Sequence, residues 1–370
     1  MTHLTNNAIF NIMEQWAPKS LAYEWDNVGL QIGSYNKPVK KVMITLDVLE
    51  PVVDEAIENH VDLIIAHHPL LFKSIKQINT DTPAGRVMEK LIKHDITVYA
   101  AHTNLDAAEG GVNDMLCDRL GVDDREVLVD TDTERLYKLA VYVPTTHLDT
   151  VRDALSGQGA GHIGNYSHCT FQTPGQGTFK PLAGTDPFIG FQDEIAFVDE
   201  VKIETIVQEQ KLSSVINAII QAHPYEEVAY DIFPLKNAGK NIGIGRIGTL
   251  TPAMNVEELS AHVKAVMNIS HVRVIGDITK KVNKVAILGG SGEKYIHTAK
   301  QKGADVYITG DMTFHVAQDA WVSGIPVIDA GHYIEEVMKH STKNHLDDEL
   351  QDDAVEIIVS KVNTDPFQML

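Results

Sequence analysis

The sequence predicts an α/β protein in which two facing α/β lobes form one domain, interrupted by an α+β insertion. Three observations support this fold class. Helical and buried-strand patterns alternate near the N-terminus, the alternation stops in the middle of the chain, and it resumes toward the C-terminus. A chain of 370 residues is long enough for two or three domains. We expect a first lobe over residues 1–128, an inserted module over 129–280 and a second lobe over 281–370.

The first lobe alternates amphipathic helices with short apolar strands. Branched aliphatic runs bounded by polar residues are typical of strands that are buried in a parallel sheet. We expect helices over residues 6–16, 51–60, 86–94 and 110–120, and strands over residues 41–47, 62–68 and 96–102.

The middle of the chain has a different pattern. Residues 138–144 predict a strand, 148–155 predict a helix, and 204–235 predict a strand, a helix and a strand. Two such units without further alternation indicate a ferredoxin-like module. Between them, the stretch from Gly157 to Gly190 holds eight glycines. We interpret it as a long loop, which is either a mobile surface insertion or a segment with a regulatory or ligand-gripping role.

The second lobe resumes the alternation of strands and helices. We expect strands at Val285, Val306 and Val327, separated by helices over residues 295–302, 314–322 and 334–343. Both lobes end their strands in metal-competent residues, so we expect the lobes to face each other across a shared site.

The apolar run LIIAHHPL, residues 63–70, ends in the adjacent pair His67 and His68. A buried strand tolerates imidazoles only at its end, so the pair is expected at a sheet edge that faces a crevice. Side chains of neighbouring strand residues diverge. Two metal ions, one for each histidine, are therefore the more specific hypothesis. The pair could instead cap the strand through hydrogen bonds.

Four more predicted strands end in residues of the same kind. Ligands bind beyond the carboxyl ends of strands in open α/β sheets, so these residues are expected to gather. His332 and Glu336 are four residues apart at a predicted helix start and would share one helix face, although most such pairs are solvated surface. The four segments supply His102, Asn104 and Asp106; Gly289 to Glu293; Asp311 and His315; and Asp329, His332 and Glu336.

A candidate ligand set for two divalent metal ions follows: His67, His68, Asp106, His332 and Glu336. Mixed nitrogen and oxygen donors suit zinc, and also iron or manganese. Five ligands shared by two ions leave positions open for water, which distinguishes catalytic from structural sites. A bound ion lowers the pKa of water from 15.7 to roughly 7. Metal-assisted hydrolysis is the reaction class that this set predicts.

Composition excludes several other classes of protein. The formal charge is -20, with 31 basic and 51 acidic residues, which disfavours nucleic-acid binding as the main role. No apolar run approaches the ~18 residues of a membrane span, and the N-terminus lacks the pattern of a secretory signal. Cys117 and Cys169 have no CxxC partner. We expect a cytoplasmic protein without a membrane partner.

Several motifs together resemble the GTP cyclohydrolase 1 type 2 family, also called the Nif-three-like metal-binding proteins. The motifs are WDNVGLQIG at Trp25 to Gly33, AHHPL at the histidine pair, HTNLD ending at Asp106, TGD at Thr309 to Asp311, and GHYIEE at Gly331 to Glu336. The resemblance implies dinuclear ligands at the same five positions, a homohexameric ring, and a PII-like or CutA-like insertion in which HPYEEVAYDI is the most recognisable part. Glu335 departs from the family pattern, in which a small polar residue is commoner.

The resemblance also implies an activity, the opening of the imidazole ring of GTP. Water would add at C8, formate would leave, and the product would go on to dihydroneopterin triphosphate. His102 or His315 would act as a proton shuttle, or else as a hydrogen-bonding partner of a ligand. No GxxxxGKS loop is present to bind a triphosphate, and the turn at Gly289 to Gly292 is either a phosphate nest or an ordinary turn.

Two alternative functions remain open at this point. The same two ions would serve a hydrolase of another substrate, such as a phosphoester. The second alternative is a non-enzymatic ring of subunits that holds metal or senses nucleotides through its middle module. In every case the metallated centre would carry about two net positive charges inside an acidic chain, and it would attract a small anion such as GTP.

Overall fold

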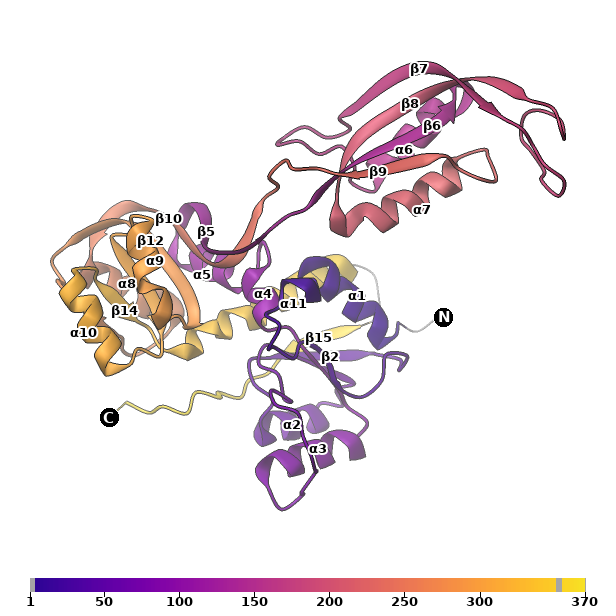
Figure 1. Ribbon diagram of the computed structural model, residues 1–370. Coiled ribbons are helices and arrows are strands. Elements are labelled where there is room, and N and C mark those ends of the chain that lie inside the picture. The colour runs from indigo at the N-terminus through magenta and orange to yellow at the C-terminus, as the bar shows by residue number, and fades with distance from the viewer. Residues whose placement is uncertain (1–3, 351–354, 370) are drawn as a thin grey trace. The chain divides into compact units, whose positions relative to one another are not determined.

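The computed structural model describes residues 4–350 and 355–369, which divide into two compact units (Figure 1). The first unit combines the chain up to Thr131 with the chain from Ile242 onward, and the second is Asp132–Asn241. The insertion thus ends at Asn241 and not at residue 280, because the segment after it joins the sheet of the second lobe. Among the described residues, no helix has both the length and the apolar character that crossing a bilayer requires.

The first lobe is a five-stranded sheet with the order β1-β4-β3-β2-β15. All strand pairs are parallel except β1 with β4. Every residue of β3 and β4 is buried, which explains their continuous apolar sequences. The strands are β1 (Gly29–Ile32), β2 (Lys41–Thr45), β3 (Leu63–Ala66), β4 (Thr97–Ala100) and β15 (Glu356–Val359). The helices are α1 (Asn6–Trp16), α2 (Glu50–Glu58), α3 (Pro83–Lys93), α4 (Thr103–Ala107) and α5 (Val112–Leu120).

The second lobe is a six-stranded sheet with the order β11-β14-β13-β12-β10-β5. The three strands β12, β13 and β14 are parallel, whereas β10 is antiparallel to β12 and β11 is antiparallel to β14. The strands are β5 (Val122–Thr133), β10 (Asn241–Asn255), β11 (Arg273–Ile275), β12 (Lys281–Ser291), β13 (Val306–Gly310) and β14 (Val327–Asp329). The helices are α8 (Val256–Met267), α9 (Ile296–Gln301), α10 (Phe314–Ser323) and α11 (Val337–Leu350).

One hydrophobic core joins the two lobes. It includes Leu116 of α5, Ile287 of β12 and Met338 of α11, all of them fully buried. A buried ion pair adds to this junction: Arg246 of β10 donates hydrogen bonds of 2.9 and 2.8 Å to the carboxylate of Asp114 in α5. Breaking a buried pair leaves an uncompensated charge, so the two partners hold their elements together. The lobes therefore present their strand ends to each other in a fixed relation.

The second unit has the element order β-α-β-β-α-β of a ferredoxin-like fold. Its sheet has the order β7-β8-β6-β9, with antiparallel pairs throughout. Both helices pack their apolar residues, such as Val151 and Ile219, on one face of this sheet. The elements are β6 (Leu136–Pro144), α6 (Leu148–Gly157), β7 (Thr170–Phe179), β8 (Ala196–Gln208), α7 (Leu212–Ala222) and β9 (Tyr230–Pro234).

The glycine-rich stretch of the second unit contains a strand that sequence analysis had treated as loop. β7 pairs with β8 along its whole length, from Thr170 opposite Thr205 to Phe179 opposite Ala196. Pro174 and two glycines lower the strand propensity of this segment. Such residues are tolerated on an edge strand, which has one neighbour only. The α/β fold class is confirmed, but the long loop is shorter than expected.

Candidate metal centre

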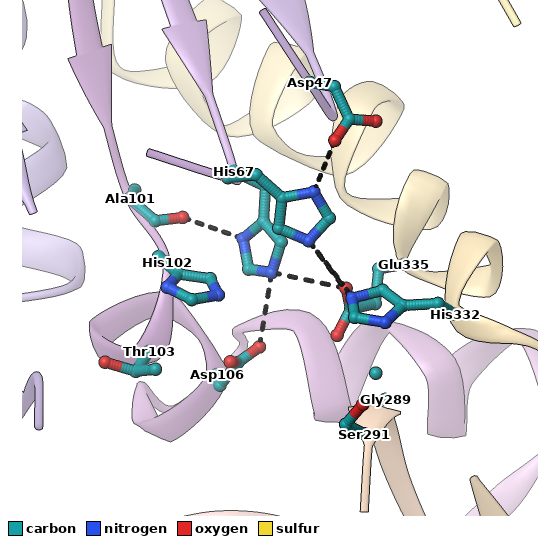
Figure 2. Close-up of polar contacts among 12 residues, drawn as sticks. Asp47, His67, Ala101, His102, Thr103, Asp106, Gly289, Ser291, His332 and Glu335 are labelled. Carbon is teal, nitrogen blue, oxygen red and sulfur yellow. Dashed lines mark hydrogen bonds and ion pairs between the residues drawn. The ribbon is translucent and has the colours of Figure 1, made fainter. Parts of the chain in front are cut away.

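Four imidazoles and two carboxylates converge at the carboxyl ends of strands from both lobes (Figure 2). His67 and His68 directly follow β3. The backbone N–H of His67 donates to the carbonyl of Thr45, and that of His68 donates to the carbonyl of Leu46, so both residues continue the pairing with the neighbouring strand segment. The end of the parallel neighbour β4 lies alongside, because Ala66 pairs with Ala100. The six residues are His67 and His68 after β3, His102 and Asp106 after β4, and His332 and Glu335 after β14.

The donor atoms of these side chains form three groups, and within each group they lie within 4.8 Å of one another. The groups are His68, His332 and Glu335; His67, Asp106 and Glu335; and His67, His68 and His102. Glu335 belongs to two of them. Its Oε2 lies 3.1 Å from Nε2 of His332, 3.2 Å from Nε2 of His68 and 3.7 Å from Nε2 of His67. One carboxylate thus serves two adjacent sets of donors.

Each of the four imidazoles has a hydrogen-bond acceptor at Nδ1. An Nδ1–H that donates to an oxygen fixes the tautomer and leaves the Nε2 lone pair free for a metal. The pairs are His68 with Asp47 at 2.7 Å, His332 with Asp311 at 2.6 Å, His102 with Asp26 at 3.0 Å, and His67 with the carbonyl of Ala101 at 2.8 Å. This repeated arrangement is the one that metal-binding histidines use in proteins.

Two buried polar atoms at the centre have no hydrogen-bond partner, Nε2 of His67 and Oδ1 of Asp106. The two atoms are 3.6 Å apart, and the imidazole of His67 is completely buried. An unpaired buried donor or acceptor costs about 1–3 kcal/mol, so native proteins rarely contain one. A divalent cation between the two atoms would satisfy both. The nitrogen and oxygen donors present therefore fit a borderline divalent ion such as zinc.

Electrostatic interactions at the centre shift several pKa values in opposite directions. Burial lowers the pKa of His67 to about 3. Burial also opposes protonation of His68, but hydrogen bonds to Asp47 and Glu335 raise its pKa to about 10. The hydrogen bond to Glu335 raises the pKa of His332 to about 9. Burial and the charge of Glu335 raise the pKa of Asp106 well above its ordinary value. Protons thus occupy positions that divalent cations would take, and metal binding would release them.

The carboxylate of the second lobe that lies closest to the histidines is that of Glu335, whereas the expected ligand Glu336 lies beside Lys339. The expectation assumed an α-helix, in which residues four apart share a face. The segment His332–Glu336 is instead a 3₁₀ helix, with three residues in each turn, so His332 and Glu335 lie on the same side. The Glu335 side chain is buried at the centre, whereas Glu336 forms an ion pair of 3.0 Å with Lys339.

The two candidate proton shuttles have different positions. The ring centroid of His102 lies 5.2 Å from that of His67 and 5.6 Å from that of His68. His315 is exposed on α10, where its Nδ1 lies 3.2 Å from Oε1 of Gln318. It belongs to none of the metal-competent groups found among the described residues. The structure brings His102 to the centre but not His315.

The glycines at the end of β12 pack against Glu335 and His332. Gly290 has a φ of +62°, and a Cβ on this residue would lie 2.6 Å from Oε1 of Glu335 and 3.4 Å from Nε2 of His332. Glycine is needed here for its backbone conformation and for the close approach. The turn therefore makes room for the carboxylate of Glu335, and sequence analysis had considered only a phosphate nest or an ordinary turn.

Sequence reasoning missed three carboxylates that hold the histidines. Asp47 is the last residue of the predicted strand over residues 41–47, so the same strand-end signal was available for it. Asp26 lies inside the WDNVGLQIG motif, which had been used for the family resemblance only. Asp311 had been noted at a strand end without a role, and it accepts from Nδ1 of His332 and from Oγ of Ser291.

The family model for Duf34/NIF3 (NGG1p interacting factor 3) matches residues 4–366. The chain belongs to this family. Two NIF3 relatives bear the name GTP cyclohydrolase 1 type 2 homolog. The Bacillus subtilis protein is 54% identical over 98% of both chains, and the Halalkalibacterium halodurans protein is 51% identical over 98% of both chains.

Solved structures extend the NIF3 assignment to the whole architecture. The crystal structure of a Bacillus cereus protein related to NIF3 matches with a TM-score of 0.94 and 48% identity, and it covers 100% of both chains. A Staphylococcus aureus protein matches with a TM-score of 0.77 and 34% identity, again over 100% of both chains. The similarity of this NIF3 chain to both proteins therefore spans the insertion as well as the two lobes.

Proposed function

We propose that this NIF3 protein is a metal-dependent hydrolase with two divalent ions. The ligands would be His67, His68, Asp106, His332 and Glu335, with zinc as the expected metal and iron or manganese as alternatives. The observation that carries the proposal is the pair of donor groups that share Glu335. When bound, the ions would supply Lewis-acid chemistry and an acidified water.

We propose GTP as the substrate, with hydrolytic opening of its imidazole ring and release of formate. The name of the relatives, GTP cyclohydrolase 1 type 2 homolog, supports this choice. A cavity of about 1600 Å³ next to the centre offers room for a nucleotide. His68 and His332 line this cavity together with Arg273, Lys339 and Lys361. Arg273 pairs with Asp329 and Lys339 pairs with Glu336 in the same wall, so the bound metal ions would be the main attraction for a small anionic ligand in a chain whose net charge is -20.

We assign the proton transfers to Nε2 of His102. Burial raises the pKa of Asp26, but hydrogen bonds from His102 and Thr103 outweigh burial and lower it to about 2. The carboxylate is therefore ionised at neutral pH and holds Nδ1 of His102 at 3.0 Å. This pairing holds the imidazole ring in place and leaves Nε2 to accept or deliver a proton. His315 has no corresponding contact with the centre.

We also propose a cytoplasmic homohexamer whose metal sites face an enclosed space. The exposed apolar side chains of α10 support an assembly: Trp321 is 66% exposed and Val322 is 84% exposed. Adjacent exposed apolar residues of this size often mark protein interfaces. Sedimentation equilibrium would test the proposal, and a monomer at micromolar concentration would contradict it.

The test of function is metal analysis of untagged protein followed by measurement of formate released from GTP. We expect two ions for each chain, and we expect His67→Ala and His332→Ala to lose both metal and formate release while remaining folded. Ile92→Ala, an exposed change on α3, serves as the control. Hydrolysis of a phosphodiester without formate release from GTP would show that the substrate is a phosphoester and not GTP. GTP binding without any turnover would favour a non-enzymatic nucleotide sensor.

A further inference from the structure

Two exposed aromatic side chains stand beside the metal centre without a role in it. Trp25 is 58% exposed and Phe72 is 49% exposed. The indole of Trp25 stacks on Tyr23 at 5.6 Å between centroids with 16° between the planes, and it meets Phe72 edge-on at 5.8 Å. Side chains this exposed bury little apolar area, so packing alone does not explain them.

The segment that carries Trp25 is held on both sides. The backbone N–H of Tyr23 donates to Oγ1 of Thr103 at 3.1 Å, and the Tyr23 hydroxyl lies 3.3 Å from that of Tyr295. On the other side, Asp26 accepts from Nδ1 of His102 and from the backbone N–H of Thr103. The indole therefore has a defined position even though most of its surface is free.

The motif WDNVGLQIG also holds the backbone next to the second aromatic residue. Asn27 donates through Nδ2 to the carbonyl of Leu71 at 2.6 Å, and Oε1 of Gln31 accepts from the backbone N–H of Leu71 at 3.1 Å. Phe72 is the next residue along the chain. The polar residues of the motif thus hold the backbone beside both aromatic residues, whose rings meet each other, and the contacts of Asn27 and Gln31 involve none of the proposed metal ligands.

His102 connects these rings to the metal ligands. Its ring centroid lies 6.2 Å from that of Trp25 and 6.5 Å from that of Phe72, in both cases edge to face. The same ring lies 5.2 Å from that of His67. A flat ligand on the aromatic pair would therefore lie one side chain away from the centre, next to the proposed proton carrier.

We propose that Trp25 and Phe72 form a stacking subsite for a planar heteroaromatic ring, which places the reacting part of a purine beside His102. The subsite rests on the proposed function, because it concerns the substrate of the same centre. Rigid, exposed π faces bind flat rings by offset or edge-to-face stacking, and they give no comparable gain to a phosphate. The subsite thus recognises the base, and recognition of the phosphates is left to the metal centre.

Calorimetric titration of the metal-loaded, full-length protein tests the subsite with two probes, guanosine and inorganic triphosphate. We expect Trp25→Leu to weaken guanosine binding about tenfold, and Trp25→Phe to keep it within about twofold, because phenylalanine retains a π face. Neither change should alter triphosphate binding. Phe72→Ala should also weaken guanosine binding, while Ile92→Ala, which removes a 58% exposed side chain from α3, should have no effect.

The outcomes separate this subsite from the proposed activity. Unchanged guanosine affinity in Trp25→Leu would overturn the subsite, and so would a lack of guanosine binding to the unaltered protein, even if GTP is turned over. Guanosine binding that depends on Trp25 without formate release from GTP would support the subsite and contradict the cyclohydrolase activity. All variants are compared at equal metal content, since His102 lies between the aromatic pair and the ligands.

Discussion

The carboxylate Oε2 of Glu335 lies 3.2 Å from Nε2 of His68, although 267 positions separate the two residues in the chain. This contact joins the strand ends of two different sheets. The first lobe supplies His67, His68 and Asp106, and the second supplies His332 and Glu335. Neither lobe holds a complete set of donors, so the centre forms only when both lobes have packed on their shared core.

Exchange of Glu335 for glutamine is expected to remove bound metal. The amide is neutral and cannot serve two donor sets as a carboxylate does, so we expect Glu335→Gln to lose at least one of two ions for each chain. Glu336→Gln is the matched control, because that carboxylate pairs with Lys339. Elemental analysis of both proteins decides the matter. Metal loss in Glu336→Gln alone would show that Glu336 is the ligand, as α-helical spacing predicted, and that Glu335 is not.

Gly290→Ala is expected to disturb the centre as well as the backbone. A left-handed conformation costs a residue with a Cβ about 1–2 kcal/mol, and the new methyl group would meet Glu335. Gly121→Ala is the control, since its φ of +69° imposes a similar strain with nothing within 4 Å of the added Cβ. We expect both variants to lose a similar free energy of unfolding, but only Gly290→Ala to lose metal. Equal metal content in the two would mean that Glu335 moves freely.

Excision of residues 132–241 is expected to leave the metal centre intact. Oγ1 of Thr131 donates to the carbonyl of Ile242 at 3.2 Å, so a short linker can join the two ends. All proposed ligands lie outside the excised unit. Excision of residues 129–280 is the comparison, and we expect it to aggregate because it also removes α8 and β10, which pairs with β12. Metal content and solubility of both proteins test the boundary.

Stability of the second unit is expected to fall as the pH drops below about 6.5. Burial lowers the pKa of His223. Its Nε2–H donates to the carbonyl of Tyr142 at 2.9 Å, and its Nδ1 accepts from the N–H of Tyr225 at 3.1 Å, so the folded state needs the neutral ring. The unfolded chain binds a proton near pH 6.5 and the folded chain does not, so acid favours unfolding.

Scanning calorimetry of the full chain at about pH 7.5 and about pH 5.5 measures this effect. We expect His223→Gln to lower stability at neutral pH and to reduce the loss on acidification. His168→Gln is the control, because that side chain is exposed. An identical pH dependence in the unaltered protein and in His223→Gln would show that this ring does not control the transition.

Strand-end reasoning predicted much of the candidate site, and particular residues show where it stopped. His67, His68, Asp106 and His332 follow apolar runs, so a linear pattern was enough to select them. Asp47 has the same signal but was passed over, because no single strand reveals which carboxylate contacts which imidazole. β7 was taken as loop, since Pro174 and the neighbouring glycines conceal an edge strand whose pairing with β8 comes from tertiary structure.

The sequence by itself determined the α/β class, the interrupted order of the lobes and the strand ends that carry ligands, because burial imposes a hydrophobic period that survives in a linear pattern. Tertiary structure alone decided that Glu335 and not Glu336 meets His68, that the insertion ends at Asn241, and that His102 but not His315 reaches the centre. These outcomes depend on a 3₁₀ turn, on sheet pairing and on lobe packing. Contacts between residues hundreds of positions apart leave no periodic signal in the chain.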